Sequence, residues 1–164
     1  TLQQQAAAAK AESAKKLTPA EVKLRTETED TLASAENAMV ALRKAFKLNP
    51  NTFDASIIDT VQRKALEMSG SKDQKLLNTK ELENLLGTQA LEKLKSAFPG
   101  AISNDERKVM MDLQGIDAKS KEERQLIMQN AYEVLQSRKI KEKKRLDDIL
   151  AGSYRDTKPI DSED

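Results

Sequence analysis

The sequence predicts an all-α protein: a multi-helix antiparallel bundle of about five helices with a long, coiled-coil-like C-terminal helix. Apolar residues recur every three or four positions through most of the chain, which is the period of an α-helix. No stretch alternates apolar and polar residues for long enough to form a strand. The strong helix formers Ala, Leu, Lys, Glu and Gln dominate the composition. Short predicted turns between the helices favour antiparallel neighbours.

The longest predicted helix follows Ser120. Ser120 and Glu123 have the spacing of a capping box, in which the hydroxyl accepts a backbone N–H of the first turn and the carboxylate accepts the backbone N–H of the cap residue. Gly152 is the expected stop. The helix would contain about 30 residues and extend roughly 45 Å. Ser103 and Glu106 predict the same kind of start for the helix before it.

The middle of this long helix is basic. Six of the eight residues from 138 to 145 are Lys or Arg: Arg138, Lys139, Lys141, Lys143, Lys144 and Arg145. Weak contact with phosphates or with an acidic partner is the functional interpretation. The alternative is a solvated helix surface whose charge is offset by nearby acids such as Glu142 and Asp147. We favour the alternative, because charged helical faces are usually solvated and no aromatic residue interrupts this run.

The first long helix has the best start signal in the chain. Thr18 is the expected N-cap, Pro19 occupies the first helical position, and Glu21 supplies the capping-box acid. The helix should run to about Leu48, where Asn49 and the following proline end it. Its apolar stripe, a candidate core or interface surface, is Leu24, Thr28, Leu32, Ala35, Met39, Leu42 and Phe46.

Two more helices are predicted between residues 55 and 98. The first runs from about Ala55 to Met68. Residues 73–77 are compatible with a helical turn or a loop, and Asn78 with Glu81 predicts a capping box for the second helix. Close packing of a neighbouring helix is our explanation for Gly87 inside that helix, where glycine costs about 1 kcal/mol against alanine. The candidate stripe of this helix is Leu82, Leu85, Leu86, Leu91, Leu94 and Phe98.

The chain divides into three predicted parts. Residues 1–16 are an Ala/Gln-rich helical linker or tail from an upstream segment, residues 17–152 form the bundle, and residues 153–164 are a polar, acidic tail. Within that tail, Tyr154 is expected to pack back on the last helix. Because the sequence starts with Thr and not Met, we expect a processed or cropped piece of a longer protein.

The composition narrows the classes of function. The sequence has 28 basic and 27 acidic residues, a net charge of +1 that argues against a general polyanion binder. It has neither Cys nor His, which excludes disulfides, thiol nucleophiles, Cys/His zinc sites and histidine acid–base chemistry. No apolar run approaches the length of a transmembrane helix.

The sequence contains no motif typical of an enzyme active site. Adjacent carboxylates, as at Asp147 and Asp148, point about 100° apart on a helix and do not converge on one substrate atom. There is no glycine-rich phosphate loop and no nucleophile elbow. We therefore expect no enzymatic activity, no cofactor and no small-molecule substrate, and we assign no catalytic, cofactor-binding or metal-ligating residue.

Four stretches in this order resemble a known family: LRTETEDTL at 24–32, LLGTQALEKLKSAFPG at 85–100, ERKVMMDLQG at 106–115 and LAGSY at 150–154. Together they are similar to the C-terminal helical region of virion-associated proteins of tailed bacteriophages, which are described as DNA-transfer, injection or ejection proteins. The resemblance covers most of residues 17–155. The chain departs from the pattern near 99–104, where the family has a Gly-Gly turn.

The resemblance implies a virion protein that is made in the host cytoplasm, packaged in or attached to the particle, and ejected with the genome to help form a conduit. Delivery to the host periplasm or envelope on infection is the matching expectation. The implied partners are other virion proteins and copies of this chain, with at most weak, non-specific DNA contact. Two alternatives stay open: a static phage component, such as a scaffold, head–tail or tail protein, and a generic coiled-coil adaptor.

The apolar stripes also predict assembly. Those at 24–46 and 82–98 are more apolar than a thin bundle can cover by itself, and exposed apolar patches usually mark interfaces. We therefore expect self-association or a virion partner.

Overall fold

The computed structural model describes residues 1–5 and 17–152. Residues 17–152 form six α-helices and contain no strand, which confirms the predicted all-α bundle. The helices are α2 (Pro19–Leu48), α3 (Ile57–Met68), α4 (Gln74–Asn84), α5 (Leu91–Ala97), α6 (Asn104–Gln114) and α7 (Lys121–Leu150). Two 3₁₀ turns, η1 (Asn49–Asn51) and η3 (Ile116–Ala118), and the π-helical segment η2 (Leu85–Ala90) complete the order. Residues 2–5 form a separate helical turn.

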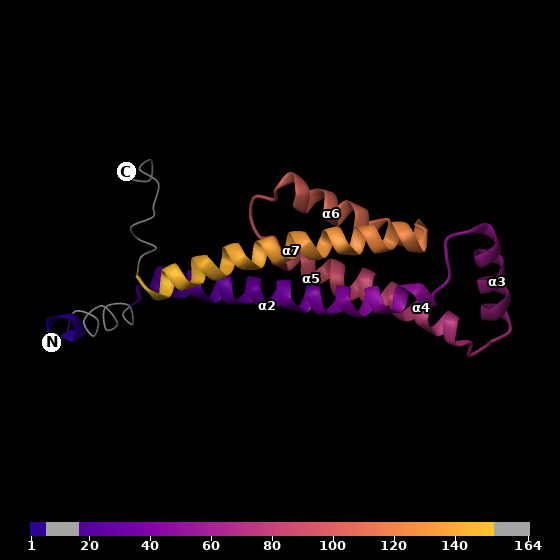
Figure 1. The fold of residues 1–164 in the computed structure, drawn as a ribbon, viewed down its shortest axis with the longest axis horizontal. Helices are drawn as coiled ribbons and strands as arrows, with labels where there is room; N and C mark the ends of the chain where they lie inside the picture. The colour runs from indigo at the N-terminus through magenta and orange to yellow at the C-terminus, as the bar shows by residue number, and fades with distance from the viewer. Residues whose placement is uncertain (6–16, 153–164) are drawn as a thin grey trace.

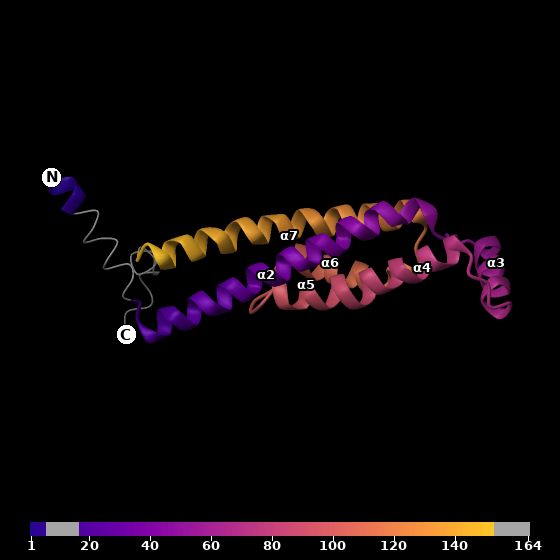
Figure 2. The same ribbon diagram turned by 90° about the horizontal axis from the view of Figure 1, so that it is seen from below.

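The two 30-residue helices α2 and α7 form the axis of the molecule (Figure 1). They run antiparallel and make the most extensive contact between any two elements. The rod formed by α4, η2 and α5 packs along one side of this pair, as Figure 2 shows. Helix α6 packs against α7 and α5, while α3 lies at the end of the molecule and contacts α4. The result is an elongated bundle.

The predicted helix starts are confirmed at α2, α6 and α7. Thr18 Oγ1 accepts the backbone N–H of Glu21 at 3.2 Å, and Ser120 Oγ accepts that of Glu123 at 3.1 Å. Each of these cap hydroxyls also donates to the carboxylate of the same acid, at 2.9 Å and 3.1 Å. At α6 the carboxylate of Glu106 accepts the backbone N–H of Ser103, so the predicted capping box is complete there, whereas the one predicted at Ser120 is not. The helix starts depend on residues three positions apart, so the local sequence was sufficient to predict them.

The start predicted at Asn78 is wrong. Helix α4 begins at Gln74, because Asp73 caps it by accepting the backbone N–H of Leu76 at 3.2 Å. Asn78 lies inside the helix, and its side-chain amide donates to the backbone carbonyl of Asn51 at 3.2 Å. Its role is therefore to hold the η1 turn against α4, a contact that links positions 27 residues apart.

The explanation offered for Gly87 is also wrong. Gly87 is exposed in η2, and a Cβ added there would meet no neighbouring atom within 4 Å. No close approach of another helix requires a glycine. The π-helical turn inserts an extra residue into the ladder, and it lies where the continuous rod passes from α4 to α5. Leu86 and Ala90 in this segment are both buried.

The core is built from small and aliphatic side chains. Most of the predicted stripe residues are buried: Thr28, Ala35, Met39, Leu42, Leu82, Leu85, Leu86, Leu94 and Phe98. Leu24, Leu32 and Leu91 are half-buried. Phe46 is 37% exposed, so of the two alternatives for the stripe, core or interface, this residue does not belong to the core. Its neighbour Ala45 is fully buried instead, so α2 is rotated to bury small residues and leaves the ring at the edge of the α2–α7 contact.

Helix α3 presents its apolar face to solvent. Ile58 is 70% exposed, Val61 62% and Met68 89%, so these residues do not face the core. They lie three and seven residues apart, which places them on one side of the helix. What attaches α3 to the bundle is polar: Arg63 donates two hydrogen bonds to the carboxylate of Glu83 on α4.

Replacing Gly87 with alanine should stabilise the protein. The site is open and helical, so the change removes backbone entropy of the unfolded chain without a clash. We expect the free energy of unfolding to rise by about 0.5–1 kcal/mol, measured by urea denaturation followed by circular dichroism. The matched control is Gly100→Ala, at a backbone φ of +75° that alanine rarely adopts, which should destabilise. A Gly87→Ala variant less stable than the parent would contradict this.

Candidate functional site

The basic segment of α7 does not form one cationic surface. Arg138 is turned inward, and its side chain is 11% exposed. Its guanidinium contacts Glu106 of α6 at 3.1 Å and the backbone carbonyl of Pro99 at 3.2 Å, and Nε lies 3.2 Å from Glu142 Oε1. Glu142 is itself buried, with a side chain 5% exposed. Arg138 therefore joins α7 to α6 and to the turn that precedes it.

Two further cations of the segment have acidic neighbours within the chain. Lys139 Nζ lies 2.9 Å from Glu36 Oε1 on α2, and Arg145 lies 3.9 Å from Glu142. The other three, Lys141, Lys143 and Lys144, are exposed, and no acid lies within ion-pair distance of them in the part of the chain that the structure describes. Three of the six cations therefore contact acids within the chain, and Lys141, Lys143 and Lys144 are the ones available to a partner.

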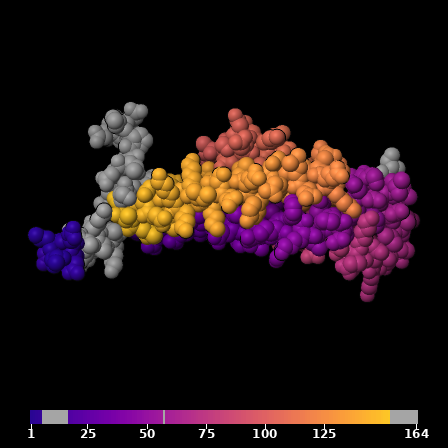
Figure 3. Space-filling view, in the orientation of Figure 1, coloured from indigo at the N-terminus to yellow at the C-terminus, as the bar shows by residue number. Residues whose placement is uncertain are grey.

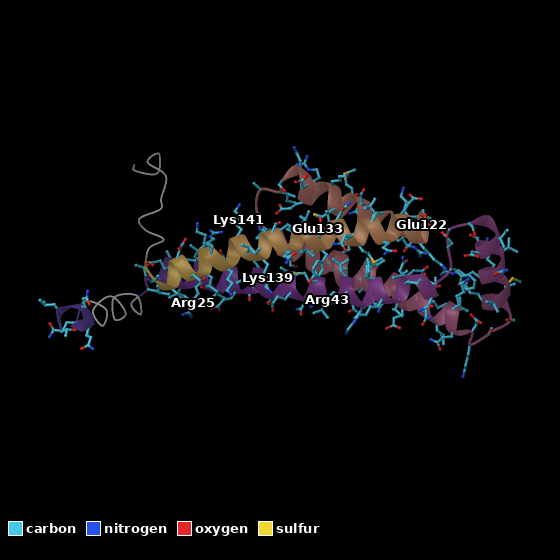
Figure 4. All side chains as sticks on the ribbon, viewed as in Figure 1. Arg25, Arg43, Glu122, Glu133, Lys139 and Lys141 are labelled. Atoms are coloured by element: carbon cyan, nitrogen blue, oxygen red, sulfur yellow. The ribbon has the colours of Figure 1, made fainter. Side chains whose placement is uncertain are left out.

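A groove runs between α2 and α7, on the side of the pair away from α4 and α5. It consists of two adjoining hollows of about 510 Å³ and about 210 Å³, both lined by Arg43 and Tyr132. Figure 3 shows the face on which α7 and α2 lie side by side, and Figure 4 labels Lys139 and Arg43 on it. The groove brings together Lys139 and Lys143 of the basic segment with Met39, Leu42 and Phe46 of the predicted stripe.

The floor of the groove is apolar and partly open to solvent. Met39, Leu42 and Met128 are buried beneath it. Ile140 at 66% exposed and Val40 at 39% remain accessible along its length, as does Phe46. The two helices are held in register across the groove by the Lys139–Glu36 ion pair and by Arg43, whose guanidinium lies 5.9 Å from the centre of the Tyr132 ring.

The rims of the groove are basic. Arg43 and Lys47 line it from α2, while Lys139 and Lys143 line it from α7. Each pair is spaced four residues apart, so both members project from the same side of their helix. Glu36 is the one acidic residue among the lining residues, and it already pairs with Lys139. The groove therefore combines an apolar floor with a positive potential.

A separate cleft of about 460 Å³, at the end of the bundle near α3, is lined mainly by polar residues. Arg124, 4% exposed, donates to the backbone carbonyl of Phe53 at 2.6 Å, while its buried Nε has no hydrogen-bond partner in the described structure. Burial lowers the pKa of the Arg124 guanidinium, and Asp54 is the strongest of the acids that oppose this shift. Burial raises the pKa of Asp117, and Glu83 adds to the rise.

This polar cleft acts as a joint between α3 and the bundle. Asp54 accepts the backbone N–H of Lys121 at 3.2 Å, and Asn49 donates to the carbonyl of the same residue at 2.8 Å. The backbone N–H of Phe53 is bonded to Thr79 Oγ1 at 2.8 Å. Arg63 pairs with Glu67 and Glu83 inside the cleft, and the bonds above tie the segment between α2 and α3 to α4 and α7, so we assign the cleft a structural role.

The groove is the feature that sequence reasoning missed. Arg43 and Lys47 lie four positions apart in the sequence, which places them on one face of α2. No local pattern indicates that this face lies beside Lys139 and Lys143, about one hundred positions away. Only the packing of α2 against α7 brings them together.

The described residues contain neither a candidate metal site nor a candidate membrane-spanning helix. Within residues 1–5 and 17–152, no group of three or more Asp or Glu side chains is placed to hold a metal ion. No helix in those ranges is long and apolar enough to cross a membrane. The chain matches no protein-family model, and comparisons with curated proteins and with solved structures found no match.

Replacing Arg138 with methionine should strongly destabilise the fold. The change leaves Glu106 buried without its cation and Glu142 with only the more distant Arg145, which costs about 3 kcal/mol or more. Lys144→Met on the same helix is the control, and because Lys144 is exposed it should change stability by less than about 0.5 kcal/mol. Urea denaturation measures both. Equal effects would show that the buried ion pairs contribute nothing.

Binding to DNA should be weak and sensitive to salt. At most three exposed cations of the basic segment are free of acidic partners within the described chain, so the log–log slope against salt should not exceed about 3. Fluorescence anisotropy with labelled duplex at about 50 and 150 mM salt measures that slope. Submicromolar affinity that persists at the higher salt and is abolished by Lys143→Glu with Lys144→Glu would contradict this.

Proposed function

We propose that this chain is a helical assembly module of a virion-associated DNA-transfer protein of a tailed bacteriophage, ejected with the genome. The proposed role of the module is to bind other virion proteins, and copies of itself, through helix–helix contacts. The structural observation that supports assembly is the groove between α2 and α7, whose apolar floor is open to solvent. The phage setting is supported by the four sequence stretches at 24–32, 85–100, 106–115 and 150–154.

The architecture suits a protein that passes through a narrow channel. The bundle is long and narrow, and its core is made largely of Ala and Leu. The sequence contains no cysteine, so unfolding breaks no covalent cross-link. The helix starts carry their own caps, which lets each helix re-form from local signals after passage.

The molecule presents two surfaces that other subunits could bind. One is the groove, and the other is the exposed side of α3 formed by Ile58, Val61 and Met68. Apolar residues gathered on one side of an exposed helix are typical of interaction surfaces. Two separate surfaces on one rod are what a subunit needs to contact more than one neighbour.

The location of the chain during infection tests this proposal. Virions carrying an epitope-tagged copy are adsorbed to host cells, particles are removed by shear, and the cells are fractionated. We expect the tagged chain in the envelope or periplasmic fraction, with the major capsid protein remaining in the removed particles as the control.

Two results would contradict the proposal in different ways. If the chain stays with the removed particles, it is a static head–tail or tail component. If the chain is absent from purified virions, the adaptor alternative gains support and the phage assignment fails.

A further inference from the structure

We propose that the groove between α2 and α7 binds one amphipathic helix of another protein, with Asp and Glu on both flanks of its apolar stripe. The proposal specifies the chemistry of the partner in the assembly role. It rests on the proposed function only in taking that partner to be another virion protein. Among the residues that the structure describes, those lining the groove belong to α2 and α7, so both walls come from one copy of the chain.

The shape of the groove fits a helix. Its two walls are antiparallel helices, and the accessible apolar side chains of Val40, Phe46 and Ile140 line it. On the other side of the same helix pair, the rod containing α5 already packs against both α2 and α7. On α7 the lining runs from Met128 to Lys143, a length of about 22 Å that matches a helix of about 15 residues.

The positive charge at the rims of the groove favours acidic residues on the flanks of the partner helix. Cations stand on both rims: Arg43 and Lys47 on α2, and Lys143 on α7, whereas Lys139 is already paired with Glu36. A helix lying on the floor places its flanking residues directly beside these rims. Acidic flanks on that helix would therefore meet a cation on either side, and complementary rim charges raise both the association rate and the specificity.

A second copy of the chain does not fit this site. A twofold contact between two grooves would bring Arg43, Lys47 and Lys143 against their own copies, and like charges facing each other across an interface are unfavourable. The exposed stripe of α3 does not fit either, because Gln62 and Lys64 flank it and neither is acidic. The occupant is therefore a helix from a different protein.

Duplex DNA also fits poorly. The phosphates of a duplex would meet the rim cations but would leave Val40, Phe46 and Ile140 uncovered, because a duplex is too wide to reach the floor between two packed helices. An apolar helix stripe covers those side chains and removes them from water.

Two synthetic peptides test the proposal directly. Both have about 16 residues and the same leucine stripe at helical spacing, one with Glu and the other with Lys on the flanks. Fluorescence anisotropy with the full chain measures their dissociation constants. We expect the acidic peptide to bind at least about tenfold more tightly than the basic one, with an affinity that falls as salt rises.

Matched variants locate the binding on the groove. Lys47→Glu with Lys143→Glu, one exposed lysine on each rim, should weaken the acidic peptide by about tenfold. Lys141→Glu with Lys144→Glu makes the same charge change on exposed residues of α7 outside the groove, and should weaken it by less than about twofold. Ile140→Ser should also weaken binding, while Leu126→Ser, at a similarly exposed position outside the groove, should not. Circular dichroism verifies that each variant is folded.

Several outcomes would overturn the proposal. Equal binding of both peptides, or equal loss in the two lysine pairs, would remove the charge argument. Competition by duplex DNA would assign the groove to nucleic acid, and sedimentation showing that self-association blocks the peptide would assign it to a second copy. Binding that appears only after Asp161→Asn, Glu163→Gln and Asp164→Asn would assign it to the acidic tail. None of these results bears on where the chain goes during infection.

Discussion

The close antiparallel contact between α2 and α7 is the constraint on which the rest of the structure depends. Aromatic residues make up 3% of the sequence, so the core has few large side chains with which to fill space between helices. It relies instead on alanines such as Ala38, Ala45 and Ala131, which are fully buried and let the helix backbones approach. With the two long helices close together, one side of the pair can be covered by α4 and α5 while the other side stays open as a groove.

The buried charges of α7 serve the same architecture. A long helix with a basic middle would normally leave that middle solvated, yet Arg138 turns inward and meets Glu106 and Glu142. Burial of charge is tolerated when each charge has a partner, and the loss of one partner leaves the other uncompensated. The arrangement fixes where α6 docks on α7, and it removes Arg138 from any external surface. The cations left for recognition are those that the packing did not use.

The two outward-facing features of the molecule are chemically different. The groove is long, apolar at its floor and basic at its rims, whereas α3 presents a short apolar stripe with little charge beside it. Helix α3 is attached mainly through polar contacts, led by Arg63 and Glu83. A rod with a selective groove along its body and a sparsely anchored helix at its end is organised for contacts with other proteins, which is the basis of the assembly role proposed for it.

The sequence by itself determined the fold class, the two long helices and most helix ends. These features depend on signals within a few residues, such as Thr18 with Glu21, so no knowledge of the packing was needed. Tertiary structure decided the start of α4, the π-helical segment, the exposure of Phe46 and the burial of Arg138. Arg138 reaches Glu106 across 32 positions, and periodicity cannot say which helices become neighbours or how each is rotated. The groove belongs to this second group, because its two walls come from opposite ends of the described bundle and exist together only when α2 and α7 pack.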